Sequence, residues 1–282
     1  MNERKYKLIV SDVDRTLLKE DFLIPDYTIE MVKRAREQGV EFMLCTGRFF
    51  GSARPYCKYL GIDLPIISSN GAAVVDYYTW KPVIAHPIPV DVCIDLFNLL
   101  DELRIHYHFY TDRRFYVREG LNDGDFRQKH NINLPPEEQY EVIETADPCG
   151  IARRERVYKI ACRCPSEEED QRFRRGFCGN EKISITSSFT YVYEIQAAGV
   201  NKGSSLAEYA DMRGIRPEEI LAIGDNHNDI EMIRYAGTGV AVGNALDELK
   251  AVADYITDRA ENAGVGKAIA RFVFGEEPEE TD

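Results

Sequence analysis

Short apolar segments that end directly in polar or acidic loops are the feature that most constrains the fold of this chain. In the first third of the sequence, three such segments alternate with two segments of helical periodicity: residues 7–11, 28–38, 40–45, 51–60 and 65–68. The first apolar segment runs straight into Asp12 and Asp14. Alternating strands and helices of this kind predict a doubly wound α/β core with a parallel, Rossmann-like sheet.

The last third of the sequence repeats this alternation, whereas the middle differs. The late segments are predicted helices at 202–212, 229–236, 246–251 and 265–274, and predicted strands at 219–223, 238–242 and 254–257. The middle instead holds aromatic, alternating strands at 105–110, 115–117, 157–162, 183–186 and 191–195, with a charged helix at 166–177. We therefore expect residues 1–85 and 190–282 to form the core, and residues 86–189 to form an inserted α+β cap domain.

Charge and cysteine content argue against several classes of function. The chain has 282 residues and a formal net charge of −13, which repels the phosphates of nucleic acids. No apolar run approaches the length of a membrane helix, and the N-terminal residues do not read as a secretory signal. The seven cysteines, an odd number, are most simply reduced thiols in the cytoplasm. We expect neither a nucleic-acid partner nor a membrane partner, and the sequence gives no information about the oligomeric state.

Carboxylates follow two of the predicted parallel strands. Asp12 and Asp14 come after the first strand, and Asp225 and Asp229 come after the strand at 219–223. Ligands of open parallel sheets bind outside the carboxyl ends of the strands, and a site with oxygen ligands alone suits Mg²⁺. Each motif also has an ordinary explanation, because the first pair can be a solvated turn and Asp229 a helix cap.

Groups that can hold an anion lie at the start of a predicted helix and after the second and third predicted strands. Lys202 opens a predicted helix, where a cation opposes the helix dipole unless an anion compensates. Thr46-Gly47-Arg48 offers a hydroxyl, a close backbone approach and amides, and Asn70 lies in the polar loop after the third strand. A solvated lysine and plain turns would explain these residues one at a time. Polar clusters after several consecutive strands, however, favour a common site at one edge of the sheet.

Together these residues resemble the four motifs of the haloacid dehalogenase superfamily, in order. The matching segments are Asp12-Val13-Asp14-Arg15-Thr16, Thr46-Gly47-Arg48, Lys202 and Gly224–Asp229. The chain resembles in particular the Cof-type phosphatases, which carry a class IIB cap. The segments that show this resemblance are Asn70-Gly71-Ala72, Asn201-Lys202-Gly203, Val242–Ala245 and the large α/β cap. The resemblance covers nearly the whole chain. Arg15 departs from it, since the family usually has glycine there, and either loop geometry or substrate contact could be affected.

The resemblance implies a role for each matched residue. Asp12 would be the nucleophile that forms an aspartyl-phosphate, and Asp14 would be the general acid and then the base. The residues expected at a Mg²⁺ ion are Asp12, Asp14 through its backbone carbonyl, and Asp225, with Asp229 nearby as a ligand through water or as a residue that supports the ligands. The residues expected to bind the phosphoryl group or the substrate are Thr46, Gly47, Arg48, Asn70, Lys202 and Asn228.

The expected function is Mg²⁺-dependent hydrolysis of a small phosphorylated metabolite, such as a sugar phosphate. An acid at position 14 favours phosphate over halide chemistry, because an alkoxide leaving group needs a proton and a halide does not. A phosphomutase on the same scaffold would share Asp14 and stays open as an alternative. A receiver-like module, phosphorylated on Asp12 for signalling, is an alternative from another class, although receivers are shorter and have no inserted cap.

Several polar and aromatic residues of the cap could face the cleft and select the substrate. These residues are His106, Tyr107, His108, Tyr110, Arg113, Arg114 and Arg118. Strand alternation places His106, His108 and Tyr110 on one face, and Tyr107 and Phe109 on the other. Packing within the sheet is the alternative for most of them. Arg48, which belongs to a motif at the rim, is the stronger candidate for a substrate contact.

Overall fold

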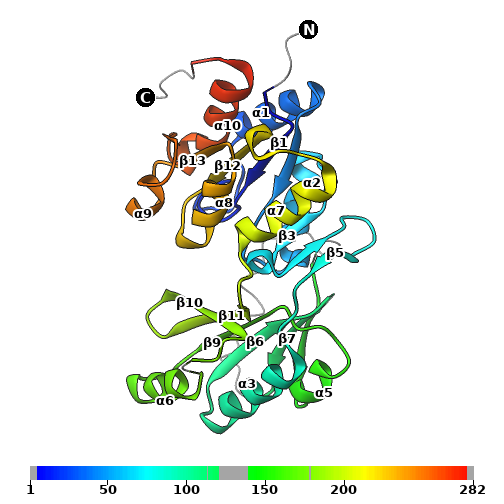
Figure 1. Cartoon of the computed structure of the whole chain (residues 1–282), viewed down its shortest axis with the longest axis vertical. Helices are drawn as coiled ribbons and strands as arrows, with labels where there is room; N and C mark the ends of the chain where they lie inside the picture. Colours follow the sequence, from blue (N-terminus) through cyan, green and yellow to red (C-terminus); the bar gives the residue numbers. More distant parts are fainter. Residues whose placement is uncertain (1–4, 113, 121–138, 178, 278–282) are drawn as a thin grey trace.

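A computed structural model describes residues 5–112, 114–120, 139–177 and 179–277 of the chain. Its elements form two units that lie one above the other in Figure 1, with both chain termini on the upper unit. The chain leaves the upper unit after β5 (Pro82–Ala85) and returns to it after β11 (Val192–Ala197). We refer to the upper unit as the core and to the lower unit as the insert.

The core is built on a five-stranded parallel sheet with the strand order β14-β13-β12-β1-β2. Its strands are β1 (Leu8–Ser11), β2 (Glu41–Leu44), β12 (Ile220–Gly224), β13 (Thr238–Ala241) and β14 (Tyr255–Ile256). Every residue of β1, β12 and β13 is buried, as expected for strands that are covered on both faces. The prediction of a doubly wound, parallel α/β core is confirmed, and the strands lie close to the predicted segments.

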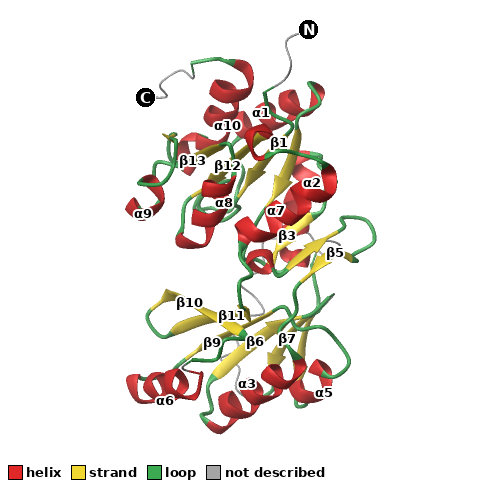
Figure 2. Cartoon of the chain, in the orientation of Figure 1, coloured by secondary structure: helices red, strands yellow, loops and turns green. Residues whose placement is uncertain are grey.

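Helices form the outer layers of the core in Figure 2. The core helices are α1 (Asp26–Glu37), α2 (Phe50–Leu60), α7 (Lys202–Arg213), α8 (Ile230–Tyr235), α9 (Asp247–Lys250) and α10 (Gly264–Ile269), which continues as a π-helical turn over Ala270–Phe274. Met31, Val32 and Ala35 recur at helical spacing in α1 and are buried, and α1 packs against α10. No helix within the described ranges combines the length and the apolar character that a membrane crossing requires.

The third predicted strand lies next to the parallel sheet but belongs to a small sheet of its own. β3 (Ile66–Ser68) contacts the end of β2 through one parallel bridge, between Cys45 and Ile67. It pairs with β4 (Ala73–Val75), and β4 pairs with β5, in an antiparallel three-stranded sheet. β4 and β5 are not among the predicted strands, because each is very short and neither shows an alternating pattern.

The insert is a mixed sheet with helices on one face. Its strand order is β10-β11-β9-β6-β7-β8, and every pair is antiparallel except β7 with β8. The other strands are β6 (His106–Tyr110), β7 (Phe115–Arg118), β8 (Val142–Thr145), β9 (Lys159–Arg163) and β10 (Ile183–Phe189). The helices are α3 (Val90–Glu102), α5 (Pro148–Ala152) and α6 (Glu167–Phe177). Figure 2 shows them on the side of the sheet turned away from the core.

The sheet of the insert extends beyond the predicted border with the core. Residues 86–189 are expected to form the insert, but β11 follows this segment and pairs with both β10 and β9. A strand held between two neighbours belongs to their sheet, so the insert continues to Ala197 rather than ending at residue 189. The predicted strands and helix of this region are present, whereas α3, β8 and α5 are additional elements.

Each unit has its own apolar interior, and a third, aromatic cluster joins the two. The interior of the core surrounds β1 and β12, and the interior of the insert lies between its sheet and its helices. Phe49, which precedes α2, packs against Tyr110, Phe115 and Tyr140 of the insert, with ring centroids 5.6, 6.4 and 5.6 Å away. This aromatic cluster places the sheet of the insert directly beside the loop that contains Thr46-Gly47-Arg48.

Candidate active site

Three carboxylates from two loops meet at the carboxyl ends of β1 and β12. Asp12 directly follows β1, while Asp225 and Asp229 lie in the loop and the short 3₁₀ turn after β12. One carboxylate oxygen of each residue lies within 4.8 Å of the other two, and all three residues are buried. The structure thus brings together three of the four predicted metal-site residues, which we refer to as the acid cluster.

Lys202 supplies the positive charge beside the acid cluster. Its side chain is fully buried at the start of α7, and Nζ lies 2.5 Å from Oδ1 of Asp12 and 2.6 Å from Oδ1 of Asp229. Burial opposes a charged ammonium, but these two carboxylates outweigh it and raise the pKa of Lys202 above its ordinary value. Lys202 is therefore a permanent cation at this rim.

One ammonium does not balance three buried carboxylates. Burial raises the pKa of Asp12 well above its ordinary value despite the attraction of Lys202, and the neighbouring acids add to the rise. Burial and the charge of Asp229 likewise raise the pKa of Asp225 to about 6, against a hydrogen bond of 3.0 Å from the Thr16 hydroxyl. The acid cluster therefore carries more negative charge than the described protein groups around it compensate.

Asp229 differs from its two partners because both of its carboxylate oxygens have hydrogen-bond donors. Oδ1 accepts from Lys202, and Oδ2 accepts the backbone amides of Asp225 and Asn226 at 3.0 Å each. A side chain on Gly224 would place Cβ only 2.6 Å from the Cβ of Asp229, so glycine permits this arrangement. Asp229 thus holds the loop and the lysine together.

The acid cluster has the donor set of a divalent cation site. Its donors are all oxygen atoms, and the raised pKa values of Asp12 and Asp225 express a repulsion that a bound cation would relieve. Within the described residues, Oδ2 of Asp12 and Oδ2 of Asp225 accept no hydrogen bond, so both can turn to a metal ion. These residues fit the metal that the sequence resemblance implies.

Asp14 lies outside the acid cluster and forms a bidentate ion pair with Arg48. Its two oxygens lie 2.7 Å from Nε and 2.5 Å from Nη2 of Arg48, while Nη1 donates to the Tyr56 hydroxyl at 3.3 Å. The Asp14 side chain is 47% exposed, in contrast to the buried acids. Arg48, the predicted substrate contact, is thus bound to the predicted general acid in this structure.

Arg15 has a left-handed backbone conformation, with φ of 59°. Its carbonyl accepts a hydrogen bond of 2.7 Å from Nδ2 of Asn244, which holds the loop against the segment after β13. Glycine adopts this conformation without cost, whereas a residue with a side chain loses roughly 1 kcal/mol. Loop geometry is therefore the physical reason for the glycine that the family usually has at this position.

The loop after β2 uses the amides of Arg48 and Thr46 in hydrogen bonds of its own. The Arg48 amide donates to Oγ1 of Thr46 at 3.1 Å, and the Thr46 amide donates to the carbonyl of Ile67 at 2.8 Å. The Gly47 amide has no acceptor among the described residues, so it is available to an anion. A Cβ on Gly47 would lie 2.6 Å from Oδ1 of Asn70, which explains the glycine.

Asn70 connects three loops of the rim. Its backbone is left-handed, with φ of 56°, and its amide donates to the Thr46 carbonyl at 3.0 Å. Its side-chain Oδ1 accepts from Nδ2 of Asn228 at 3.0 Å, and its Nδ2 donates to Oε2 of Glu194 at 2.7 Å. The structure thus places the predicted residues Gly47, Asn70 and Asn228 in direct contact.

Lys159 and Glu194 of the insert belong to this rim but were missed in the sequence. Nζ of Lys159 lies 2.6 Å from the carbonyl of Gly47 and 2.7 Å from Oε1 of Glu194, and only 2% of the lysine side chain is exposed. Burial opposes a charge on Glu194, but Lys159 and Asn70 outweigh it and hold the pKa of Glu194 below its ordinary value. Charged residues within otherwise apolar strands were the available signal.

The predicted cleft residues of the insert divide between packing and the side that faces the core. Tyr107 and Phe109 pack on Phe97 of α3, with ring centroids 5.5 and 4.8 Å away, as strand alternation predicts. His108 and Tyr110 lie on the opposite face, where the Tyr110 hydroxyl contacts Nε2 of His108 at 3.3 Å. Tyr110 reaches the rim, because its ring lies 5.2 Å from Nζ of Lys159.

Two of the three arginines proposed for the cleft form ion pairs within the insert. Arg114 pairs with Glu155 at 2.8 Å, and Arg118 pairs with Asp101 at 2.9 Å. Arg113 lies outside the described residues. These ion pairs favour the packing alternative for Arg114 and Arg118.

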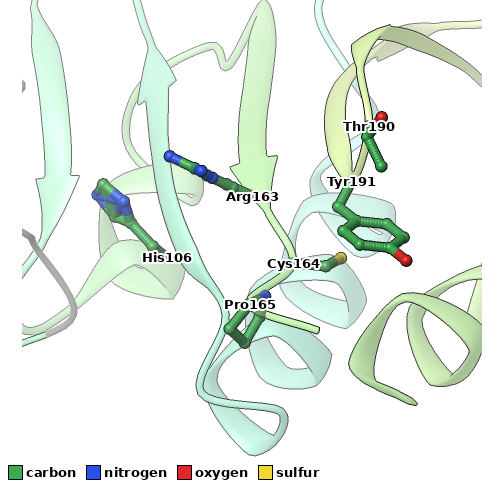
Figure 3. A pocket seen from close by; sticks show the side chains of 6 residues that line it. All are labelled: His106, Arg163, Cys164, Pro165, Thr190 and Tyr191. Atoms are coloured by element: carbon green, nitrogen blue, oxygen red, sulfur yellow. The ribbon is translucent and has the colours of Figure 1, made fainter. Parts of the chain in front are cut away.

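A separate cavity of about 310 Å³ lies in the insert, at the ends of its strands (Figure 3). Its lining residues are His106, Arg163, Cys164, Pro165, Thr190 and Tyr191. Of these, only His106 was predicted to face a cleft, and no residue of the acid cluster contributes to the lining. The cavity is therefore distinct from the rim of the core sheet.

Comparison with known proteins shows which proteins this chain resembles along its length. The sequence profile of the haloacid dehalogenase-like hydrolases matches residues 9–269. The pyridoxal phosphate phosphatase YbhA of Escherichia coli (strain K12) is 29% identical over 269 residues, which are 95% of this chain and 97% of that protein. The 5-amino-6-(5-phospho-D-ribitylamino)uracil phosphatase YcsE of Bacillus subtilis (strain 168) is 31% identical over 268 residues, with coverages of 95% and 96%.

Solved structures show the same relationship. A haloacid dehalogenase-like hydrolase from Bacteroides thetaiotaomicron has a TM-score of 0.82 and 28% identity, and the match covers 95% of this chain and 99% of that one. The structure of the subclass IIB sugar phosphatase BT4131 has a TM-score of 0.75 and 25% identity, with coverages of 94% and 98%. Since the profile and the relatives match along nearly the whole chain, this protein belongs to the haloacid dehalogenase-like hydrolase family and is a phosphatase enzyme.

Proposed function

We propose that the enzyme hydrolyses small phosphomonoesters with the help of Mg²⁺ and through a phosphorylated Asp12. The observation that carries this proposal is the position of the Asp12 carboxylate, buried between the acids of the β12 loop and the ammonium of Lys202. An anionic nucleophile can approach an anionic phosphate only where positive charge compensates both. Lys202 supplies part of that charge, and the acid cluster supplies a place for more.

Asp12 and Asp225 would hold the metal ion, together with the backbone carbonyl of Asp14 that the family resemblance implies. When bound, Mg²⁺ would neutralise charge on the phosphate and on the carboxylates around it. Asp229 keeps Lys202 and the β12 loop in position through its hydrogen bonds. The Gly47 amide and Lys202 would donate to phosphoryl oxygens, with Thr46 and Asn228 next to them.

The reaction would run in two displacement steps at phosphorus, with Asp12 as the nucleophile in the first and the leaving group in the second. Its carboxylate oxygen bonds to phosphorus while the bond from phosphorus to the ester oxygen breaks, and the ester oxygen leaves with the electron pair and a proton from Asp14. Water then attacks the phosphoryl group, gives a proton to Asp14 and releases phosphate, which restores the Asp12 carboxylate. Asp14 therefore ends the cycle protonated, as it began.

The ion pair between Asp14 and Arg48 bears on the choice of substrate. Both oxygens of Asp14 are bound by the guanidinium, so Asp14 is a carboxylate in this pair. It can donate a proton to a leaving group only after the pair has opened and Asp14 has taken up a proton from solvent. A second polar or anionic group on the substrate that binds Arg48 would open it. Small metabolites that carry such a group beside the phosphate, including sugar phosphates, are therefore the substrates we propose.

The relatives support a small substrate without identifying it. One curated relative is named for pyridoxal phosphate, another for a phosphorylated ribitylaminouracil, and a structural relative is described as a sugar phosphatase. All three kinds of compound are compatible with a phosphomonoester site at the rim of the core. A cytoplasmic location is also proposed, since the six cysteines in the described part of the chain are free thiols.

The test is a phosphate-release screen over sugar phosphates, pyridoxal phosphate and other small phosphomonoesters, with Mg²⁺ and with a chelator. We expect release by the wild-type enzyme in Mg²⁺ and none by Asp12→Asn. Equal release by both proteins would refute the role of Asp12. Product analysis distinguishes the phosphomutase alternative, which would return the phosphoryl group to a second hydroxyl of the substrate. A phosphate retained on Asp12 without turnover would instead indicate the receiver-like alternative.

A further inference from the structure

Lys159, which is buried, and Glu194, which is partly buried, form an ion pair at the boundary between the insert and the core. They come from the neighbouring strands β9 and β11, and Glu194 lies opposite Ala161 in the register of those strands. The two side chains project toward the core, where Lys159 contacts the Gly47 carbonyl and Glu194 contacts Asn70. Both contacts fall on loops that, under the proposed function, surround the phosphate.

Lys159 fixes one peptide group of the loop after β2. The carbonyl of Gly47 accepts from Nζ of Lys159, and the amide on the other side of that peptide bond, from Arg48, donates to Oγ1 of Thr46. The peptide plane is therefore held at both ends. Because this plane is fixed, the adjacent Gly47 amide has less freedom to turn. That amide is the one available to an anion.

Glu194 fixes the side chain of Asn70. Because Glu194 accepts a hydrogen bond, the amide nitrogen of Asn70 faces it, and the Oδ1 atom is left to accept from Asn228. The same Oδ1 atom lies 2.6 Å from the place that a Cβ would take on Gly47, so Asn70 also packs against this glycine. A single ion pair of the insert thus orients both loops at once.

The charges of the pair have partners that are internal to the protein. The ammonium of Lys159 contacts Glu194, the Gly47 carbonyl and the ring of Tyr110, and each oxygen of Glu194 has a donor. A largely buried ion pair whose hydrogen bonds are satisfied in this way holds its surroundings in place. This distinguishes it from the acid cluster, in which two oxygens have no donor among the described residues.

We propose that Lys159 and Glu194 are positioning residues through which the insert holds the phosphate-binding groups of the core in place. The proposal rests on the proposed function only in taking the rim as the phosphate site. It assigns to the insert a direct part in phosphate binding, in addition to any contact with the rest of the substrate.

The first test compares Lys159→Met with Lys182→Met, which removes an exposed lysine of the insert that is paired with Asp91. We measure the Kd of inorganic phosphate in Mg²⁺ by isothermal titration, and kcat and KM on the best substrate of the wild type. Lys159→Met is expected to weaken phosphate binding and to lower kcat/KM, each by roughly 10–100-fold. Lys182→Met should leave both quantities at the wild-type values.

Two further variants keep the test decisive if Lys159→Met does not fold. Glu194→Gln retains an acceptor for Asn70 but loses the charge, and Lys159→Arg retains a cation that can donate to Gly47. Both should fold and bind phosphate more weakly than the wild type, with Lys159→Arg recovering part of the loss. Wild-type phosphate affinity in both variants would overturn the proposal.

The measurements separate the possible roles. A merely structural role would lower the active fraction and leave the Kd of phosphate unchanged in the folded protein, whereas a contact with the leaving group would change the ranking of substrates and also leave this Kd unchanged. Either result contradicts a positioning role. If the wild type hydrolysed no phosphomonoester, or if Asp12→Asn were fully active, the proposed function would be refuted instead. The binding titration does not depend on turnover, so the two failures are distinguishable.

Discussion

The acid cluster and the Lys159–Glu194 pair are both charged and largely shielded from solvent, but they differ in charge balance. In the acid cluster, three carboxylates share one ammonium, and the pKa values of Asp12 and Asp225 rise as a result. In the pair, one cation meets one anion, and the pKa of Glu194 falls. The comparison teaches that an unbalanced buried charge marks a place for a ligand, while a balanced one marks a support for its neighbours.

The largest effect is expected from Asp12→Asn, which replaces the central carboxylate of the acid cluster. The amide cannot form the phosphoryl bond, so kcat should fall by at least about 10⁴-fold. Steady-state phosphate release measures this, with circular dichroism to show that the variant is folded. The fall should exceed that of Lys159→Met by a wide margin. Comparable losses in the two variants would break the distinction between a reacting group and a support.

Asp14→Asn should have the next largest effect. Loss of the proton donor to the leaving oxygen is expected to lower kcat by roughly 10²–10⁴-fold for alkyl phosphates. The loss should be much smaller for a nitrophenyl phosphate, because that leaving group departs without a proton. Rates for both substrates, measured on the same preparation, provide the control. An equal loss on both would show that Asp14 acts in another way, for instance by holding Arg48.

The excess of negative charge in the acid cluster predicts how the free energy of unfolding depends on pH and on metal ions. The pKa of Asp225 is about 6 in the folded protein, above its ordinary value of 3.8. The folded state therefore holds a proton on Asp225 more tightly than the unfolded chain does. The stability gained in this way is complete below pH 4 and is lost as the pH rises through 6. In chelator above pH 7, Asp225→Asn should therefore be more stable than the wild type by up to about 3 kcal/mol.

Denaturant unfolding from pH 4 to pH 8 measures this difference between Asp225→Asn and the wild type. Saturating Mg²⁺ should stabilise the wild type at pH 8 and leave the variant nearly unaffected, because the ion binds the folded state alone. Glu194→Gln, from the balanced region, should keep the Mg²⁺ response. A wild type that does not respond to Mg²⁺ would show that the acid cluster is not a metal site.

The smallest effect is expected from Arg15→Gly at the edge of the acid cluster. Glycine removes the cost of the left-handed conformation but adds freedom to the unfolded chain, so the net change in unfolding free energy should be within about 1 kcal/mol and stabilising. Thermal unfolding measures it, with Arg234→Gly in α8 as a control that should destabilise by about 1 kcal/mol. A clear loss of activity in Arg15→Gly would assign a substrate contact to the arginine side chain.

The rim of the core could be predicted because its residues follow directly from local patterns. Asp12 and Asp225 end two buried strands, and a parallel sheet must bring the carboxyl ends of such strands to one edge. The position of Gly47, which follows β2, comes from the same rule, whereas Lys202 opens a helix and was recognised from the family resemblance. The sequence thus contains enough information for the acid cluster without any long-range contact being known.

The pairing across the boundary could not be predicted in this way. Lys159 contacts a carbonyl 112 residues away, and Glu194 contacts an asparagine 124 residues away, in a register that local patterns do not specify. The border of the insert was misplaced for a related reason, since the pairing of β11 with β9 joins segments that are far apart in the chain. The link between Arg48 and Asp14 likewise depends on which loops become neighbours.

The aromatic cluster around Phe49 has a consequence for evolution and for engineering. Phe49 belongs to the core sequence, yet its ring packs only two residues from Gly47 among side chains of the insert. A transplanted insert would lack its matching contact unless Phe49 were carried along with it, and a core stripped of its insert would expose a phenylalanine beside its reaction centre. An exchange of inserts between relatives must therefore include Phe49 of the core as well as the insert itself.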